Sequence, residues 1–92
     1  MDQPQQAKAG SANAVIVTGG NRLFDGAILN PGSAAAVLTV YDGTDNTGPV
    51  IAKLVATASG YSVATPDVMV PVATGIYAEV SGTGANYVVY YE

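Results

Sequence analysis

The sequence contains no cysteine, no histidine and no tryptophan, and the first two absences exclude whole classes of site. Without cysteine, the chain has no disulfide bond and no thiolate nucleophile. Without histidine, it has no imidazole general base, and a structural zinc site would lack both of its usual ligand types. We therefore predict that the protein is not an enzyme, and we expect neither a catalytic residue, nor a metal site, nor a cofactor.

Positive charge is also scarce, because Lys8, Arg22 and Lys53 are the only cations in a sequence that contains seven acidic residues. A surface that tracks a phosphate backbone needs clustered Lys and Arg, so we expect no nucleic-acid partner. No segment approaches the roughly 18 apolar residues that a membrane-spanning helix requires. The polar N-terminal residues also lack the apolar segment of a signal peptide. We therefore expect no membrane partner and no signal peptide.

A hydrolase that uses two carboxylates is the one enzymatic alternative that this composition leaves open. Each available carboxylate, however, falls in a predicted turn or on a predicted solvent face, which argues against a catalytic pair. These residues are Asp25, Asp42, Asp45, Asp67 and Glu79.

The segment Asp42–Asn46 (DGTDN) places several oxygen ligands close together, as a calcium site does. Its spacing lacks the alternate acids and the terminal Glu of the helix-flanked calcium loop. Asp, Asn and Gly are also the residues that a tight hairpin loop requires. We therefore interpret this segment as a turn.

What the sequence does contain is an excess of apolar residues: 49% are hydrophobic and only 11% are charged. An ordinary soluble domain carries about 25% charged residues. A single domain of this size buries roughly 60–65% of the surface of its unfolded chain, so part of its apolar surface is expected to meet another protein. The alternative is that many of the apolar residues are surface alanines, which carry no penalty. We favour self-association or docking.

The chain divides into an N-terminal arm, residues 1–12, and a β domain, residues 13–92. The arm (MDQPQQAKAGSA) has no hydrophobic periodicity, so we expect it to be flexible, with Gln3, Gln5 and Gln6 as candidates for contact with a neighbouring subunit. In the β domain, short β-branched runs alternate with Gly, Pro, Asn and Asp. The predicted strands are Ala14–Thr18, Arg22–Asn30, Ala35–Tyr41, Val50–Ala56, Tyr61–Ala64, Asp67–Val72, Gly75–Val80 and Tyr87–Tyr91.

These eight short strands predict an all-β fold, either a small antiparallel β-sandwich of jelly-roll type or a barrel. The third and fourth strands, joined by the polar loop, are expected to form a hairpin. In Gly75–Val80, Ile76 and Ala78 share the predicted core face with Val80, whereas Tyr77 and Glu79 face the other way.

The last predicted strand is apolar or aromatic on both faces. Tyr87, Val89 and Tyr91 alternate with Val88 and Tyr90. Such a strand is either central in a sheet or placed at an interface, where Tyr is enriched. We name the tyrosines at positions 87, 90 and 91 as candidates for packing between subunits.

Two segments, RLFDGAILNPGSAAAVLTVYDGTDNTGPVIAKL and GIYAEVSGTGANYVVYYE, carry a resemblance to a known group of proteins. They resemble small virion proteins of tailed bacteriophages, with the shared motifs at Ala27–Gly32, Leu38–Thr44, Gly48–Ala52 and Gly75–Asn86. The resemblance spans about Arg22–Glu92. It implies a β-sandwich that decorates or cements the capsid, or forms the base of a head fibre. It also implies a homo-oligomer, with a trimer favoured, that binds the major capsid protein on the outer surface of the virion after synthesis in the host cytoplasm.

An alternative function is a tail or fibre component that recognises a host glycan. Sugar sites use exposed aromatic rings beside carboxylates. Tyr41, Tyr61 and Tyr77 could provide the rings, near Asp42 or Glu79. The absence of Trp argues against this alternative.

Overall fold

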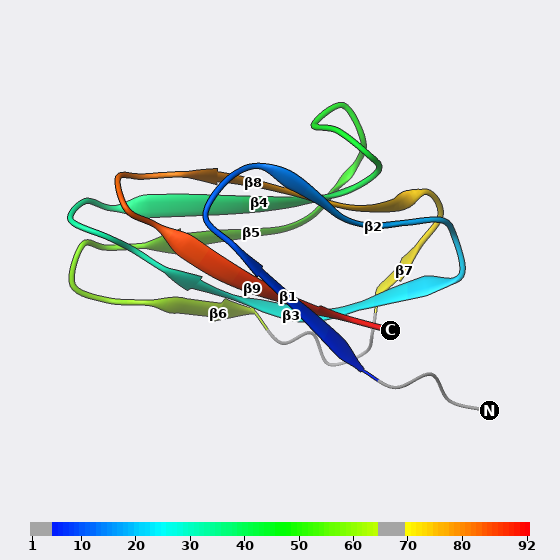
Figure 1. Ribbon diagram of the computed structural model, residues 1–92, viewed down its shortest axis with the longest axis horizontal. Helices are drawn as coiled ribbons and strands as arrows, with labels where there is room; N and C mark the ends of the chain where they lie inside the picture. Colours follow the sequence, from blue (N-terminus) through cyan, green and yellow to red (C-terminus); the bar gives the residue numbers. More distant parts are fainter. Residues whose placement is uncertain (1–4, 65–69) are drawn as a thin grey trace.

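The computed structural model describes residues 5–64 and 70–92, which form two antiparallel β-sheets packed face to face (Figure 1). Sheet A, the lower layer in Figure 1, has the strand order β1-β9-β3-β6, and β7 pairs with the other end of β3. Its strands are β1 (Gln6–Gly10), β3 (Arg22–Asn30), β6 (Ser62–Ala64), β7 (Val70–Val72) and β9 (Asn86–Tyr91). Sheet B, the upper layer, has the order β2-β8-β4-β5. Its strands are β2 (Ala14–Thr18), β4 (Ala36–Asp42), β5 (Val50–Ala56) and β8 (Gly75–Ser81).

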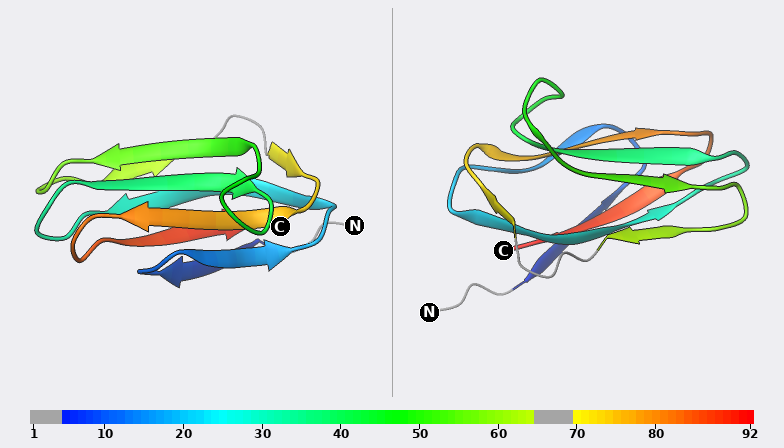
Figure 2. Two further views of the ribbon diagram at one scale, coloured as in Figure 1. Left: turned by 90° about the horizontal axis from the view of Figure 1, so that it is seen from above. Right: turned by 180° about the vertical axis from the view of Figure 1, so that it is seen from behind.

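The chain passes repeatedly from one sheet to the other, so both layers are built from segments distant in sequence (Figure 2). The β4–β5 hairpin is the only pair of consecutive strands within sheet B, and its strands pair from Ala36 with Ala56 to Tyr41 with Val50. The predicted all-β sandwich and the predicted hairpin are both confirmed.

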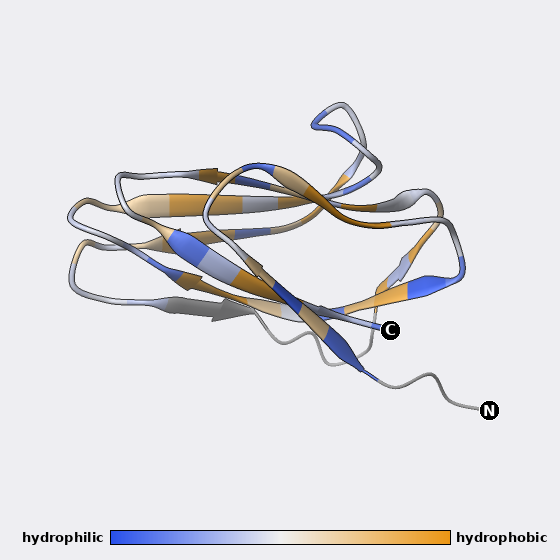
Figure 3. Cartoon of the chain, in the orientation of Figure 1, coloured by the Kyte–Doolittle hydropathy of each residue, from blue (hydrophilic) through white to orange (hydrophobic). Residues whose placement is uncertain are grey.

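The core lies between the two sheets and follows the alternation of side chains along each strand, visible as alternating bands in Figure 3. Ile76 and Ala78 in sheet B are buried, as predicted, whereas Val80 is half-buried. Leu38 and Val40 on β4 are buried as well. Sheet A contributes an equally apolar inner face. Its buried side chains are Phe24, Ala27, Leu29, Val72, Tyr87, Val89 and Tyr91.

A β-bulge in β3 allows one strand to bury side chains that regular alternation would separate. Phe24 and Leu29 are five residues apart, an odd number that would put them on opposite faces of a regular strand. The pairing with β9 shifts between Phe24 and Gly26, so that Asp25 is the extra residue. Gly26 has a φ of 146°, a backbone conformation that glycine adopts without strain. As a result, Phe24 and Leu29 both reach the core.

Strand β1 contradicts the prediction of a flexible arm. Gln6–Gly10 pairs with β9 along its whole length, so the prediction is wrong for this segment; residues 1–4, and with them Gln3, lie outside the described residues. The side chains of Gln6 to Ala9 are exposed, and the pairing therefore depends on main-chain hydrogen bonds, which leave no hydrophobic pattern in the sequence.

The end of β1 is fitted to Tyr87. A Cβ atom at Gly10 would lie 2.7 Å from the Tyr87 hydroxyl oxygen, closer than real Cβ contacts allow, so a larger residue here would displace the Tyr87 ring. The Tyr87 hydroxyl then donates a hydrogen bond to the carbonyl oxygen of Ala12 at 2.7 Å. Burial raises the pKa of this hydroxyl.

The assignment of Tyr87 and Tyr91 to contacts between subunits is wrong, because both side chains belong to the core of this chain. Their exposed fractions are 1% and 9%. Strand β9 is central in sheet A, between β1 and β3, which explains its apolar residues on both faces. Tyr90 faces the outer side of sheet A and is half-buried.

The predicted strands are reproduced closely: β2, β3 and β5 have the predicted bounds, and β4 is shifted by one residue. Strands β8 and β9 are one residue longer than predicted, and β6 is one residue shorter. Val70–Val72 is the described part of the predicted Asp67–Val72 strand, and residues 65–69 lie outside the described residues. Among the described strands, β7 pairs only with β3, in agreement with the edge position expected from Pro71.

We expect Tyr87→Ala to lower the free energy of unfolding by about 3–5 kcal/mol, because it removes a fully buried aromatic side chain. Tyr90→Ala is the matched control, because Tyr90 lies on the same strand but is half-buried and faces the outer side of sheet A, so its loss should be clearly smaller. Urea denaturation of both variants measures the difference. Equal losses would contradict the assignment of Tyr87 to the core.

Candidate functional site

The outer face of sheet B presents three rows of side chains that cross β5, β4 and β8. The strand register aligns these rows directly. They are Val55–Val37–Ser81, Lys53–Thr39–Glu79 and Val50–Tyr41–Tyr77. Most of these side chains are exposed or half-buried, so the face combines apolar, aromatic and charged groups within reach of solvent.

The carboxylate of Glu79 is the centre of the polar contacts on this face. The Tyr41 hydroxyl donates to its Oε1 at 3.0 Å, and the Asn46 side-chain amide donates to its Oε2 at 3.1 Å. The hydrogen bond to Glu79 is the main cause that raises the pKa of Tyr41, because it favours the protonated hydroxyl. Two different elements, β4 and the β4–β5 loop, therefore orient Glu79.

The aromatic rings of Tyr41 and Tyr77 lie beside this carboxylate. Their centroids are 6.2 Å apart and their planes are inclined at 50°. This separation falls within the range for interacting aromatic pairs. Both residues are half-buried, so each keeps part of its ring accessible.

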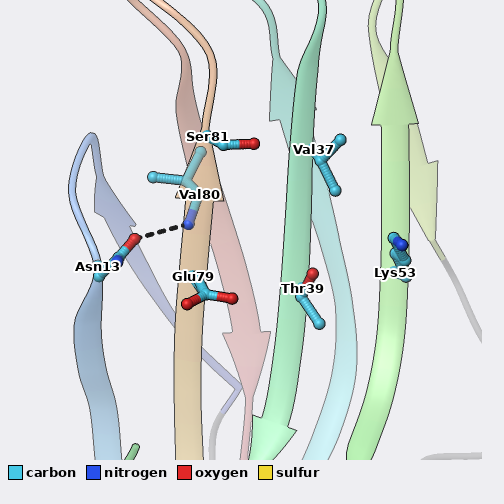
Figure 4. Close-up of a pocket in the computed structure, with 7 residues that line it drawn as sticks. All are labelled: Asn13, Val37, Thr39, Lys53, Glu79, Val80 and Ser81. Atoms are coloured by element: carbon cyan, nitrogen blue, oxygen red, sulfur yellow. Dashed lines mark hydrogen bonds between the residues drawn. The ribbon is translucent and has the colours of Figure 1, made fainter. Parts of the chain in front are cut away.

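A surface pocket of about 390 Å³ lies on the other side of Glu79 (Figure 4). Asn13, at the start of β2, borders it, and its Oδ1 accepts a hydrogen bond from the Val80 amide at 2.8 Å. The lining residues are Asn13, Val37, Thr39, Lys53, Glu79, Val80 and Ser81. Glu79 is thus shared between the pocket and the tyrosine pair.

The β4–β5 loop rises above the outer face of sheet B and borders it at the end where Tyr41 lies (Figures 1 and 2). Asp42 fixes its base: the carboxylate accepts hydrogen bonds from the amides of Ala73 and Thr74 at 2.9–3.1 Å. The Gly43 amide donates to the Gly75 carbonyl at 3.0 Å. The loop and the turn before β8 are therefore held together. The hydrogen bonds from the Ala73 and Thr74 amides lower the pKa of Asp42.

The structure separates the two aspartates that the calcium alternative required. Asp42 is directed to the turn before β8, whereas the Asp45 carboxylate accepts hydrogen bonds from the amide and the hydroxyl of Thr47. These local hydrogen bonds lower the pKa of Asp45. Among the described residues, no group of three or more acidic, histidine or cysteine side chains is placed to hold a metal ion.

Of the residues proposed for glycan recognition, the structure brings Tyr41, Tyr77 and Glu79 together. Tyr61 lies in the turn between β5 and β6, at the opposite end of the sheet, and is 72% exposed. Asn46 and Asn13 were not identified as site residues. Their contacts join strands that are more than 30 residues apart, and no local pattern in the sequence indicates such a contact.

Two of the glutamines proposed for subunit contacts, Gln5 and Gln6, make contacts within the chain. The Gln5 side-chain amide donates to Asp25 Oδ2 at 3.0 Å, and the Tyr91 hydroxyl donates to Gln6 Oε1 at 3.4 Å. Asp25 Oδ1, at the bulge in β3, is buried without a hydrogen-bond partner.

The chain matches no known family model, no curated protein and no solved structure. Within residues 5–64 and 70–92, there is no helix long and apolar enough to cross a membrane.

We expect Asp42→Asn to lower the free energy of unfolding by about 1 kcal/mol at neutral pH, because the charged acceptor of the amide hydrogen bonds is lost. The folded-state pKa of Asp42 lies below the unfolded value of 3.8. Its contribution is therefore complete above that value and disappears as the pH falls through the folded-state pKa. The urea midpoints of the wild type and of Asp42→Asn should converge as the pH falls below the folded-state pKa. Parallel curves at all pH values would contradict this role.

Proposed function

We propose that the protein is a structural component of a tailed-phage virion, which decorates the outer capsid surface and stabilises it. In this proposal it acts as a small homo-oligomer, with a trimer favoured, and binds the major capsid protein. The phage-like motifs over Arg22–Glu92 support the proposal, as does a sandwich with an exposed strand at one edge.

The observation that carries this proposal is the position of β1. It pairs only with β9 in the described part of the chain, so its other edge has unpaired main-chain groups. Such an edge can accept a strand from a second chain, and main-chain hydrogen bonds then provide the affinity. The side chains of Gln6 to Ala9 are exposed, so β1 contributes none of them to the core.

Exposed apolar side chains on β5 provide a second kind of support. Val50 and Val55 are 59% and 62% exposed, and they flank Lys53 on the same strand. Exposed valines on an outer strand are suited to packing against another protein surface.

The stabilising effect follows from mass action. A protein that binds the assembled lattice, and not the separate capsid subunits, shifts the equilibrium toward the lattice by its binding free energy. Neither a catalytic group nor a cofactor is needed for this function.

In solution, we expect the purified chain to form a discrete small oligomer, because the open edge of β1 would then be covered. Light scattering coupled to size exclusion measures the mass directly. A monomer that persists at high concentration would contradict the self-association part of the proposal.

We expect deletion of residues 2–10 to reduce occupancy of the capsid at least several-fold while the β-sandwich stays folded. The deletion removes β1 but keeps Ala12, the acceptor for the Tyr87 hydroxyl. Quantitative gel analysis of purified virions of the encoding phage measures occupancy, and circular dichroism checks the fold.

The matched control changes Gln3, Gln5 and Gln6 to alanine and keeps the main chain intact. This variant should occupy the capsid nearly as well as the wild type, because main-chain pairing does not require these side chains. Normal occupancy by the deletion variant would overturn the role of β1.

A further inference from the structure

We propose that the outer face of sheet B, where it meets the β4–β5 loop, binds a neutral oligosaccharide. We call this region the sheet B corner and define it by Tyr41, Asn46, Tyr77, Glu79 and the pocket beside Glu79. The inference does not depend on the role of β1 in the capsid proposal, since it uses sheet B, whereas β1 lies at an edge of sheet A.

The tyrosine pair provides the apolar part of the site. The C–H groups on one face of a sugar ring pack against an aromatic ring, whereas the hydroxyl groups at its edge need hydrogen-bonding partners. Tyr41 and Tyr77 are inclined at 50° and so present two differently oriented surfaces beside one carboxylate. A ligand with both apolar faces and a hydroxyl rim matches this combination.

Glu79 provides the polar part. Each carboxylate oxygen accepts one hydrogen bond within the chain, from Tyr41 or from Asn46, and these contacts hold the group in one orientation. An ionised carboxylate has about four acceptor positions, so each oxygen keeps capacity for a ligand hydroxyl. Because the carboxylate only accepts and carries negative charge, it favours a neutral ligand rich in hydroxyl groups over an acidic one.

The pocket extends the site away from the tyrosines. Successive rows on the face are about 7 Å apart, so the three rows span about 14 Å, which is longer than one sugar ring. Thr39 and Lys53 lie in the row of Glu79 and provide further hydrogen-bond donors (Figure 4). The ligand we propose is therefore an oligosaccharide rather than a monosaccharide.

The β4–β5 loop decides against a second copy of the chain as the occupant of this face. It rises above the sheet, so a flat sheet from another subunit would meet the loop before it met the tyrosines (Figure 2). A narrow, extended ligand would instead lie beside the loop, along the face that leads to the pocket. Asn46 belongs to this loop and contacts Glu79, so the loop is itself part of the site.

The test is a glycan array that displays neutral hexose oligosaccharides, N-acetylated oligosaccharides and sialylated oligosaccharides. We expect the full-length protein to bind neutral hexose oligosaccharides and to bind sialylated ones more weakly. Titration calorimetry with the best neutral oligosaccharide should then show about tenfold weaker binding for Glu79→Gln and for Tyr77→Ala, the loss of one well-made polar or aromatic contact.

Tyr61→Ala is the matched control, since it removes an exposed tyrosine that lies outside the sheet B corner, and its affinity should be unchanged. Glu79→Gln keeps the size of the side chain, and thermal melts verify that both site variants are folded. Three results would overturn the inference: no binding to any neutral oligosaccharide, full binding by both site variants, or an equal loss in Tyr61→Ala. The variant that lacks residues 2–10 keeps the sheet B corner, so it should bind the oligosaccharide even though its binding to the capsid is reduced.

Discussion

The strict alternation of side chains along a β-strand is the constraint on which the rest of this structure depends. Each strand offers every second residue to the core, and β3 satisfies this rule only because the bulge at Asp25 shifts Phe24 into phase with Leu29. A second shift, between Val40 and Tyr41 in the pairing of β4 with β5, adjusts the register near the β4–β5 loop. The inner faces are therefore continuous, and the outer faces are left for function.

The sequence was sufficient to predict burial and turns where the local residue pattern matches the environment of those residues in the folded chain. The alternation in β8 correctly predicted that Ile76 and Ala78 are buried, although Val80 is only half-buried, and turn residues correctly located the β4–β5 hairpin. It was insufficient for β1, whose pairing depends on main-chain groups that every residue type possesses. It was also insufficient for Tyr87, since a tyrosine in an apolar strand is compatible both with the centre of a sheet and with an interface.

The candidate site could be predicted in part for the same reason. Tyr77 and Glu79 share a strand face, which periodicity alone establishes, and Tyr41 follows from the pairing of β4 with β8. Asp42 was equally plausible from the sequence, but the structure uses its carboxylate to hold the turn before β8. This contact joins the loop to the sheet, so Asp42 positions the sheet B corner without being part of it.

The ammonium group of Lys8 lies 3.3 Å from the carbonyl oxygen of Val15, and so a side chain of β1 at the edge of sheet A hydrogen-bonds β2 at the edge of sheet B. The two neighbouring edges therefore differ. The outer edge of β1 keeps its main-chain groups available, whereas β2 has its Val15 carbonyl engaged by the positively charged Lys8. The two sheets are therefore tied together along this side by a side-chain contact as well as by the core.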